Sequence, residues 1–340
     1  DYDPVVFEQF VKSLETVQID GGTTDAIRAM CHVANTLRTT LQPTSSSSYT
    51  PSPTIAPHLE WDDTVLAEIY KATIAELGQV SETNLQDEEG RWMHACYGVI
   101  EESVDARASK NKRLMRELSQ MRAGDMLPLH PFSTVAFWHH EGRFDVLRVV
   151  VTGPKDTPYF CGVYVFDVYA PPSYPEVPPI VKIVTTGNGT VRFNPNLYSD
   201  GKVCLSLLGT WHGKDESEKW NPKTSSLYQV FVSIQALILI EQPIMNEPGY
   251  ETFAGTAEGQ RKSKLYNEEI RLNSLRHACL GMIRNPPKGT EDFVKAHFEV
   301  VAGPVVREAM RWRDESSEEN RGRFETVLKE LEGELEGLVG

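Results

Sequence analysis

A thiol stands in a polar, glycine-containing stretch of the chain, although free cysteines usually prefer the interior of a protein. In FNPNLYSDGKVCLSLLGTW, residues 193–211, Cys204 follows Asn196 by eight positions. A thiolate can attack a carbonyl carbon, and a carboxamide N–H can stabilise the oxyanion that forms. This pair of residue types predicts acyl transfer, with Cys204 as a solvent-reachable acceptor and Asn196 beside it.

Two other interpretations of this thiol stay open. It could be a small core residue, although functional groups concentrate in loop segments of this kind. It could also belong to a hydrolytic Cys–His pair, because His212 is close in sequence and His139 and His140 lie near an earlier turn. No cysteine-protease signature surrounds Cys204, which disfavours hydrolysis.

The composition limits the partners and the compartment. The chain has 340 residues, a net charge of −14 and five cysteines, none of them in a CxxC pair. An acidic surface repels nucleic acid and anionic membranes, so we expect neither as a partner. Scattered cysteines predict no metal site and no disulfide framework, and we expect no cofactor. They fit a reducing compartment, cytoplasmic and possible in the nucleus too.

The middle of the chain has the pattern of a small antiparallel sheet. Four β-rich runs follow one another: STVAFWHH, GRFDVLRVVVTGP, GVYVFDVYAPP and PIVKIVTT. Short linkers join them, which favours an antiparallel meander. The turn SYPEVPP contains three prolines and is a candidate for one cis X-Pro bond.

Helical periodicity dominates elsewhere. A helix expected over 91–121 presents a basic face, which composition alone explains as a solvated surface. A largely buried helix is expected over 224–241, capped by Thr224 or Ser225. Further helices are expected over 258–284 and 291–313. In the tail, Phe324, Leu328, Leu331, Leu335 and Leu338 form a short heptad seam, expected to dock on its own domain rather than form a coiled coil.

Three segments together resemble the ubiquitin-conjugating enzyme (UBC) family. They are GPKDTPYFCGVYVFDVYAPPSYPEVPPIVKI, FNPNLYSDGKVCLSLL and WNPKTSSLYQVFVSIQALI, in the order and with the spacing of the family. The resemblance implies an α+β fold with an N-terminal helix, a four-stranded antiparallel meander and following helices. The insertion TWHGKDESEKW and the helical tail are most similar to the large members, such as the conjugating domain of giant inhibitor-of-apoptosis proteins and the hybrid conjugating-enzyme/ligases.

The resemblance places the conjugating core at residues 110–285. Outside it we expect a helical N-terminal segment at 1–42, a Ser/Pro-rich linker at 43–57 and a helical extension at 58–109. A helical, acidic C-terminal extension is expected at 286–340. These added segments could dock on the core, position a substrate or mediate self-association.

The resemblance also implies roles for individual residues. Cys204 matches the residue that receives ubiquitin as a thioester from the ubiquitin-activating enzyme. Asn196 matches an asparagine that either stabilises the oxyanion or orders the loop that does so. Glu247, with Asn246 beside it, matches a position where relatives have an acid that helps the substrate lysine to lose a proton. A solvated loop carboxylate is an equally open interpretation of Glu247.

Partner surfaces follow from the same resemblance. Relatives use the first helix of the core to meet the activating enzyme, which would give the basic face a function. The expected partner-binding residues are Lys110, Lys112, Arg113, Arg116 and Pro222.

Two departures from the family pattern bear on function. Asn194 replaces a histidine whose part is mostly structural. Glu176 replaces an apolar residue in the proline turn that relatives use to grip ligases, so reliance on an external ligase is in doubt. The chain is therefore expected to transfer ubiquitin to lysines of protein substrates, with or without a separate ligase. The alternative is a non-catalytic UBC-fold module that presents ubiquitin or a partner.

Overall fold

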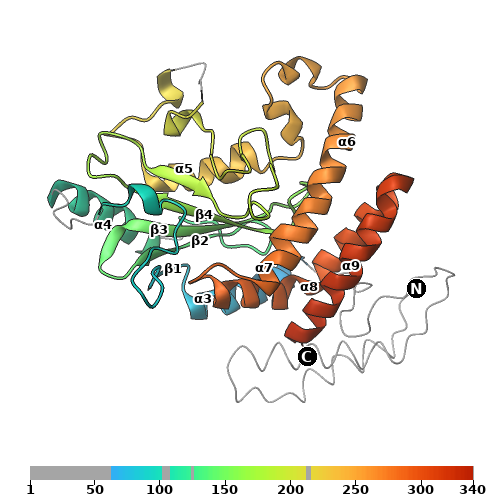
Figure 1. Ribbon diagram of the computed structural model, residues 1–340, viewed down its shortest axis with the longest axis horizontal. Helices are drawn as coiled ribbons and strands as arrows, with labels where there is room; N and C mark the ends of the chain where they lie inside the picture. The colour runs from blue at the N-terminus through green and yellow to red at the C-terminus, as the bar shows by residue number, and fades with distance from the viewer. Residues whose placement is uncertain (1–62, 102–107, 124–125, 212–215, 340) are drawn as a thin grey trace. The chain divides into compact units, whose positions relative to one another are not determined.

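The computed structural model describes residues 63–101, 108–123, 126–211 and 216–339 (Figure 1). The chain divides into two compact units. One contains residues 78–294, and the other contains residues up to 77 together with those from 295 onward. Within the described residues, no helix is both long and apolar enough to cross a membrane. The expected segments at 1–42 and 43–57 lie outside the described residues.

The larger unit is built on a five-stranded sheet in the order β1-β2-β3-β4-β5. The strands β2 to β5 form the expected antiparallel meander. The strand β1 was not expected, because its four residues, VSET, lie in a range predicted to be helical; it pairs parallel to β2. The bounds are β1 (Val80–Thr83), β2 (Val135–His140), β3 (Arg143–Thr152), β4 (Val163–Tyr169) and β5 (Ile180–Ile183).

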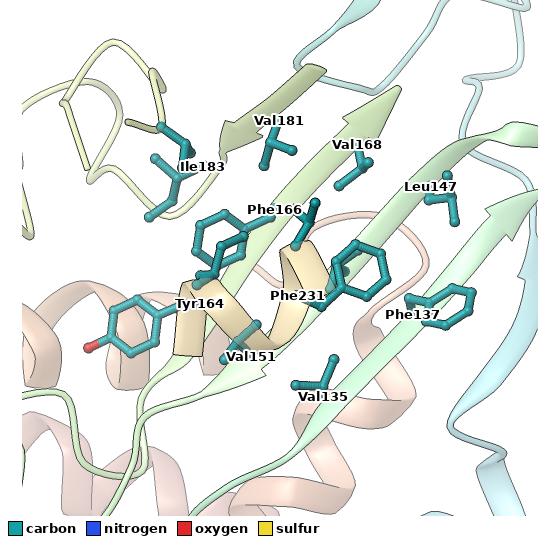
Figure 2. Packing of buried hydrophobic residues seen from close by; sticks show 14 of the residues in the cluster. Val135, Phe137, Leu147, Val151, Tyr164, Phe166, Val168, Val181, Ile183 and Phe231 are labelled. Atoms are coloured by element: carbon teal, nitrogen blue, oxygen red, sulfur yellow. The ribbon is translucent and has the colours of Figure 1, made fainter. Parts of the chain in front are cut away.

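One face of this sheet packs on two helical segments and forms the main core. The helix α4 (Ala108–Ala123) contributes Leu114 and Leu118, and α5 (Leu227–Ser233) contributes Phe231. Figure 2 shows Phe231 directed at side chains from β2 and β3, and its ring centre lies 5.6 Å from that of Phe137. Burial of these large apolar side chains stabilises the frame from which the loop of Cys204 extends.

The expected long helices after the sheet are present. The helix α5 continues into the π-helical segment η4 (Ile234–Ile238), and its N-cap is Ser226 rather than Thr224 or Ser225, because Ser226 and Gln229 form a reciprocal capping box. The run expected over 258–284 is α6 (Ala257–Asn273), η7 (Ser274–Leu280, π-helical) and α7 (Gly281–Arg284). Shorter turns of helix are η1 (Tyr97–Val99), η2 (Ser206–Leu208), η3 (Glu216–Glu218), η5 (Pro243–Asn246) and η6 (Tyr250–Phe253).

An irregular segment covers part of the opposite face of the sheet, where Leu85, Cys96 and Ile100 pack with Val146 and Tyr169. The prediction of a helix from residue 91 is wrong for residues 91–101, and α4 begins at Ala108. A buried ion pair explains this. Arg148 donates to Asp167. The Arg148 guanidinium also donates to the Met93 carbonyl at 2.6 Å, and the Asp167 carboxylate accepts from the Ala95 amide at 2.5 Å. Backbone groups that satisfy buried charges cannot also form a helical ladder.

The turn between β4 and β5 contains the expected cis bond, between Tyr174 and Pro175. A buried carboxylate ties this turn to the helices. Glu117 of α4 accepts from the Tyr174 hydroxyl at 2.9 Å and from the Leu227 amide at 2.8 Å, and it pairs with Arg113. Trp220 adds a bond of 2.7 Å from its ring nitrogen to the Pro175 carbonyl.

The other unit is helical. It contains α3 (Asp63–Leu77), α9 (Glu318–Val339) and most of α8 (Glu291–Glu315). The Tyr70 hydroxyl lies 3.0 Å from a ring nitrogen of His297, and both side chains are buried. The first four residues of the heptad seam in α9 are buried within this chain, in agreement with a docked helix.

Candidate active site

Cys204 lies in a long connection that follows β5 and turns back on itself. Gly201 makes the turn with φ of 91°, and a Cβ at this position would lie 3.1 Å from the Ile183 carbonyl oxygen. Both the positive φ and the close approach favour glycine, as the sequence suggested. The turn brings residues on either side of it together, with Leu197 bridged to Val203.

Asn196 and Cys204 are joined by two reciprocal hydrogen bonds. The Cys204 amide donates to the Asn196 backbone carbonyl at 2.9 Å, and the Asn196 side-chain amide donates to the Cys204 carbonyl at 2.8 Å. The Asn196 Oδ1 is buried and has no hydrogen-bond partner among the described residues. In this state the carboxamide orders the cysteine loop, which is one of the two roles that the sequence left open.

The cysteine is less accessible than expected. Cys204 is only 2% exposed, so the prediction of a solvent-reachable thiol is not met in this structure. It does not belong to the main hydrophobic cluster, although its neighbours Val203 and Leu205 do. Burial raises the pKa of the Cys204 thiol, whereas the exposed cations Lys202 and Arg192 oppose this effect.

Cys204 differs from another buried thiol, Cys279, in the charges that act on its pKa. Burial alone raises the pKa of Cys279, without any charged residue acting on it. Charged residues as well as burial act on the pKa of Cys204, and Lys202 and Arg192 lower it. The four cysteines in the described part of the chain, Cys96, Cys161, Cys204 and Cys279, are all buried.

The Asn194 side chain connects several parts of the site by hydrogen bonds, which the sequence analysis did not predict. Its side chain is fully buried, and its Oδ1 accepts from the Asn196 amide at 2.8 Å and from the Asn246 side chain at 3.3 Å. Its amide donates to the Ile238 carbonyl at 2.8 Å and to the Tyr159 hydroxyl at 3.2 Å. Asn194 therefore links the cysteine loop to the residue beside Glu247. No sequence signal pointed to Tyr159, which stands among apolar residues.

Glu247 follows η5 and is half exposed. Its carboxylate lies 3.5 Å from the guanidinium of Arg192, a residue that the sequence analysis did not single out. Asn246 points its side-chain amide at Asn194 and at the Leu237 carbonyl. The candidate residues Asn196, Asn246 and Glu247 are thus joined to the cysteine loop through Asn194 and Arg192.

The expected basic surface on α4 is smaller than predicted. Lys110 is 1% exposed and pairs with Asp145 at 2.8 Å, so it cannot meet a partner. Arg113 is also mostly buried, where it pairs with Glu117 and donates to the Ser225 carbonyl at 2.6 Å. These two predictions are wrong because helical periodicity turns both side chains toward buried carboxylates and carbonyls.

The remaining expected partner residues stay accessible. Lys112 and Arg116 are exposed on α4, and Pro222 is half-buried before α5. Within the part of the chain that the structure describes, no His, Cys, Asp and Glu side chains gather in a way that could hold a metal ion. The site combines a thiol and carboxamides with two carboxylates, Glu247 and Asp200, and two cations, Lys202 and Arg192.

Comparisons with known proteins agree on one family. Residues 113–273 match the family model described as ubiquitin-conjugating enzyme. The chain is 41% identical over 251 residues to the human dual E2 ubiquitin-conjugating enzyme/E3 ubiquitin-protein ligase BIRC6, covering 73% of this chain and 5% of that protein. It is 40% identical over 228 residues to a probable ubiquitin-conjugating enzyme of Acanthamoeba polyphaga mimivirus, covering 67% of this chain and 16% of that protein.

The chain therefore spans only a small part of these relatives. A solved ubiquitin conjugating enzyme domain from Toxoplasma gondii matches 49% of this chain and 98% of its own, with 25% identity and a TM-score of 0.36. The family model covers β2 to β5, the cysteine loop and α5, which are the parts that build the site. Through residues 113–273, this chain is similar to the ubiquitin-conjugating enzyme family.

Proposed function

We propose that this chain accepts ubiquitin as a thioester on Cys204 and transfers it to the side-chain amine of a substrate lysine. The observation on which this depends is the pair of hydrogen bonds between Asn196 and Cys204. They hold a carboxamide against the backbone of the cysteine, and such a donor can stabilise the oxyanion of a tetrahedral intermediate at the thioester carbon. Similarity to the ubiquitin-conjugating enzyme family supports the same chemistry.

The reaction consists of two exchanges at one carbonyl carbon. The Cys204 thiolate attacks the thioester between ubiquitin and the activating enzyme, a new C–S bond forms, and the thiolate of the activating enzyme leaves. A neutral lysine amine then attacks the new thioester, an amide C–N bond forms, and Cys204 leaves as a thiolate. The amine proton passes to a base, for which Glu247 is the candidate that the family resemblance suggests.

The low exposure of Cys204 adds a requirement to this proposal. Its raised pKa keeps the thiol protonated in the resting protein, and the sulfur is nearly covered. Docking of the activating enzyme must therefore uncover the thiol and favour its thiolate. Lys202 and Arg192 already favour the thiolate from the exposed side of the loop.

We further propose that transfer proceeds without a separate ligase. Glu176 is exposed in the proline turn, where the family pattern has an apolar ligase contact. A relative that resembles most of this chain is named as both a conjugating enzyme and a ligase, which supports this interpretation. We place the reaction in a reducing compartment, where a free thiol persists.

A gel assay tests the proposal. The protein is incubated with activating enzyme, ATP and ubiquitin, without a ligase. A reductant-sensitive conjugate is expected, which Cys204→Ala abolishes and Cys204→Ser converts to a reductant-resistant ester. Cys161→Gly is the matched control: it removes another thiol at a position with φ of 55°, a region that favours glycine, and it should load normally.

The outcomes separate the candidate functions. A thioester on the Cys204→Ala variant would contradict the assignment of the acceptor. Absence of any thioester on the wild-type protein would favour the alternative, a module that presents ubiquitin or a partner without catalysis. Loading without transfer to a substrate lysine, unless a ligase is added, would contradict ligase independence alone. The same assay with other ubiquitin-like modifiers tests the choice of ubiquitin.

A further inference from the structure

Arg192 lies at a junction between the two loops of the site. Its Nη2 donates to the Pro195 carbonyl at 2.7 Å and lies 3.5 Å from Oε2 of Glu247. Its guanidinium carbon stands 4.4 Å from the centre of the Tyr198 ring. The Arg192 side chain thus contacts the Pro195 backbone, the Tyr198 ring and Glu247, the candidate acid on the opposite loop.

These contacts lower the entropy cost of the ion pair between Arg192 and Glu247. Arg192 and Glu247 are each 42% exposed, and a pair of this kind usually contributes little stability, because solvent screens it and ordering two side chains costs entropy. Here the Pro195 carbonyl and the Tyr198 ring already fix Arg192. Pairing then orders only Glu247. The ion pair therefore fixes the position of Glu247 more than it stabilises the fold.

Arg192 also acts electrostatically on the thiol. Arg192 is one of two cations that oppose the burial effect on the Cys204 pKa. Burial raises the pKa of Tyr266 on α6 to about 12, with Arg192 opposing this and Glu247 adding to it. Arg192 therefore acts both on the reacting sulfur and on the surroundings of the carboxylate.

Building on the proposed function, we propose that Arg192 is a positioning residue for the transfer step. It holds the Glu247 carboxylate beside the cysteine loop, where the carboxylate attracts the acceptor ammonium and takes its proton. Glu247 releases this first proton to water. The neutral amine then forms the C–N bond, the C–S bond breaks, and the second nitrogen proton passes through water to the departing Cys204 thiolate. Loading involves no amine and does not need this arrangement.

The test measures loading and transfer separately. Protein loaded to completion is chased with free lysine, and the single-turnover discharge rate is recorded against lysine concentration. We expect Arg192→Gln to load fully and to discharge about threefold to tenfold more slowly, with Arg192→Lys regaining part of the rate. The defect should appear as a weaker dependence on lysine concentration at low concentrations.

A double-mutant cycle identifies the partner. If Arg192 acts through Glu247, then Arg192→Gln combined with Glu247→Gln discharges no more slowly than Glu247→Gln alone. Arg91→Gln is the matched control, because it removes an arginine that forms exposed ion pairs on the segment covering the far side of the sheet. It should leave both steps unchanged. Lys202→Gln removes a cation near the thiol that has no contact with Glu247 and should slow discharge less than Arg192→Gln does.

The results distinguish this inference from the proposed function. Normal loading with an unchanged or faster Arg192→Gln discharge contradicts the role of Arg192 alone. Additive effects in the double mutant, or equal slowing by Lys202→Gln, also contradict it, because they indicate a general effect of positive charge. A wild-type protein that forms no thioester contradicts the proposed function and the transfer role together.

Discussion

The side-chain amide of Asn196 donates to the carbonyl oxygen of Cys204 at 2.8 Å, and the Cys204 amide donates back to the Asn196 carbonyl at 2.9 Å. The donor that could stabilise an oxyanion is therefore engaged with the cysteine backbone in the resting protein. Its Oδ1 has no partner among the described residues, so the carboxamide is satisfied on one side only. Such a group can reorient when a reaction intermediate offers a stronger acceptor.

The first prediction concerns this amide. Asn196→Ala should still load ubiquitin, because the Cys204 amide keeps its bond to the backbone carbonyl of residue 196. Transfer to lysine should fall by about tenfold to a hundredfold, because the oxyanion loses a donor. Single-turnover loading and discharge assays measure the two steps. Equal defects in both would indicate that the side chain only orders the loop.

The second prediction concerns the buried side chain behind the site. Asn194→Ala should lower the free energy of unfolding by about 1–3 kcal/mol, because it leaves buried partners such as the Ile238 carbonyl without their bonds. Urea unfolding measures this change. Asn84→Ala is the control, because Asn84 is exposed and only accepts from the amide of Gln86. If the two variants lose similar stability, Asn194 does not hold the loops together.

The order of the elements could be predicted from the sequence because each depends on a local pattern. Alternation and short turns define β2 to β5, and Gly201 marks a turn that only a residue tolerant of positive φ makes easily. The covering segment before α4 could not be predicted in this way. Its conformation depends on Arg148 and Asp167, which are distant in sequence and bind its backbone.

The same distinction applies to the site. Cys204 and Asn196 have a recognisable spacing, and the structure brings them together. Arg192 and Tyr159 contribute through contacts across loops, for which a single sequence contains no signal. Lys110 belongs to a basic run in the sequence, but its position on α4 directs the side chain toward buried Asp145 and away from any partner.

The third prediction uses this buried pair and its dependence on pH. Burial raises the pKa of Asp145, but hydrogen bonds from Arg143 and Lys110 outweigh this effect and leave the pKa below its ordinary value of 3.8. A carboxyl whose pKa is lower in the folded state adds stability above its unfolded pKa and loses it as the pH falls. The stability difference between wild type and Asp145→Asn should therefore be full at pH 7. It should shrink as the pH falls below about 4.

Urea unfolding at several pH values between 7 and 3 measures this difference. Asp156→Asn serves as the control, because Asp156 is exposed in a turn. A difference for Asp145→Asn that stays constant down to the lowest pH would show that the ionised carboxylate adds no stability. Lys110→Met should reproduce the loss at pH 7, because it leaves Asp145 buried with one cation fewer.

The last prediction concerns the part of the basic face that remains exposed. Lys112 and Arg116 are the expected partner residues of α4 that solvent can reach, so they are the ones that could meet the activating enzyme. Opposite charges on two proteins mainly speed their encounter. The double variant Lys112→Gln/Arg116→Gln should load about threefold to tenfold more slowly at low concentrations of activating enzyme, and the effect should shrink as salt is added. Lys264→Gln, at an exposed position on α6, is the control and should load at the wild-type rate. A double variant that loads as fast as wild type at low salt would show that this face is only a solvated helix surface.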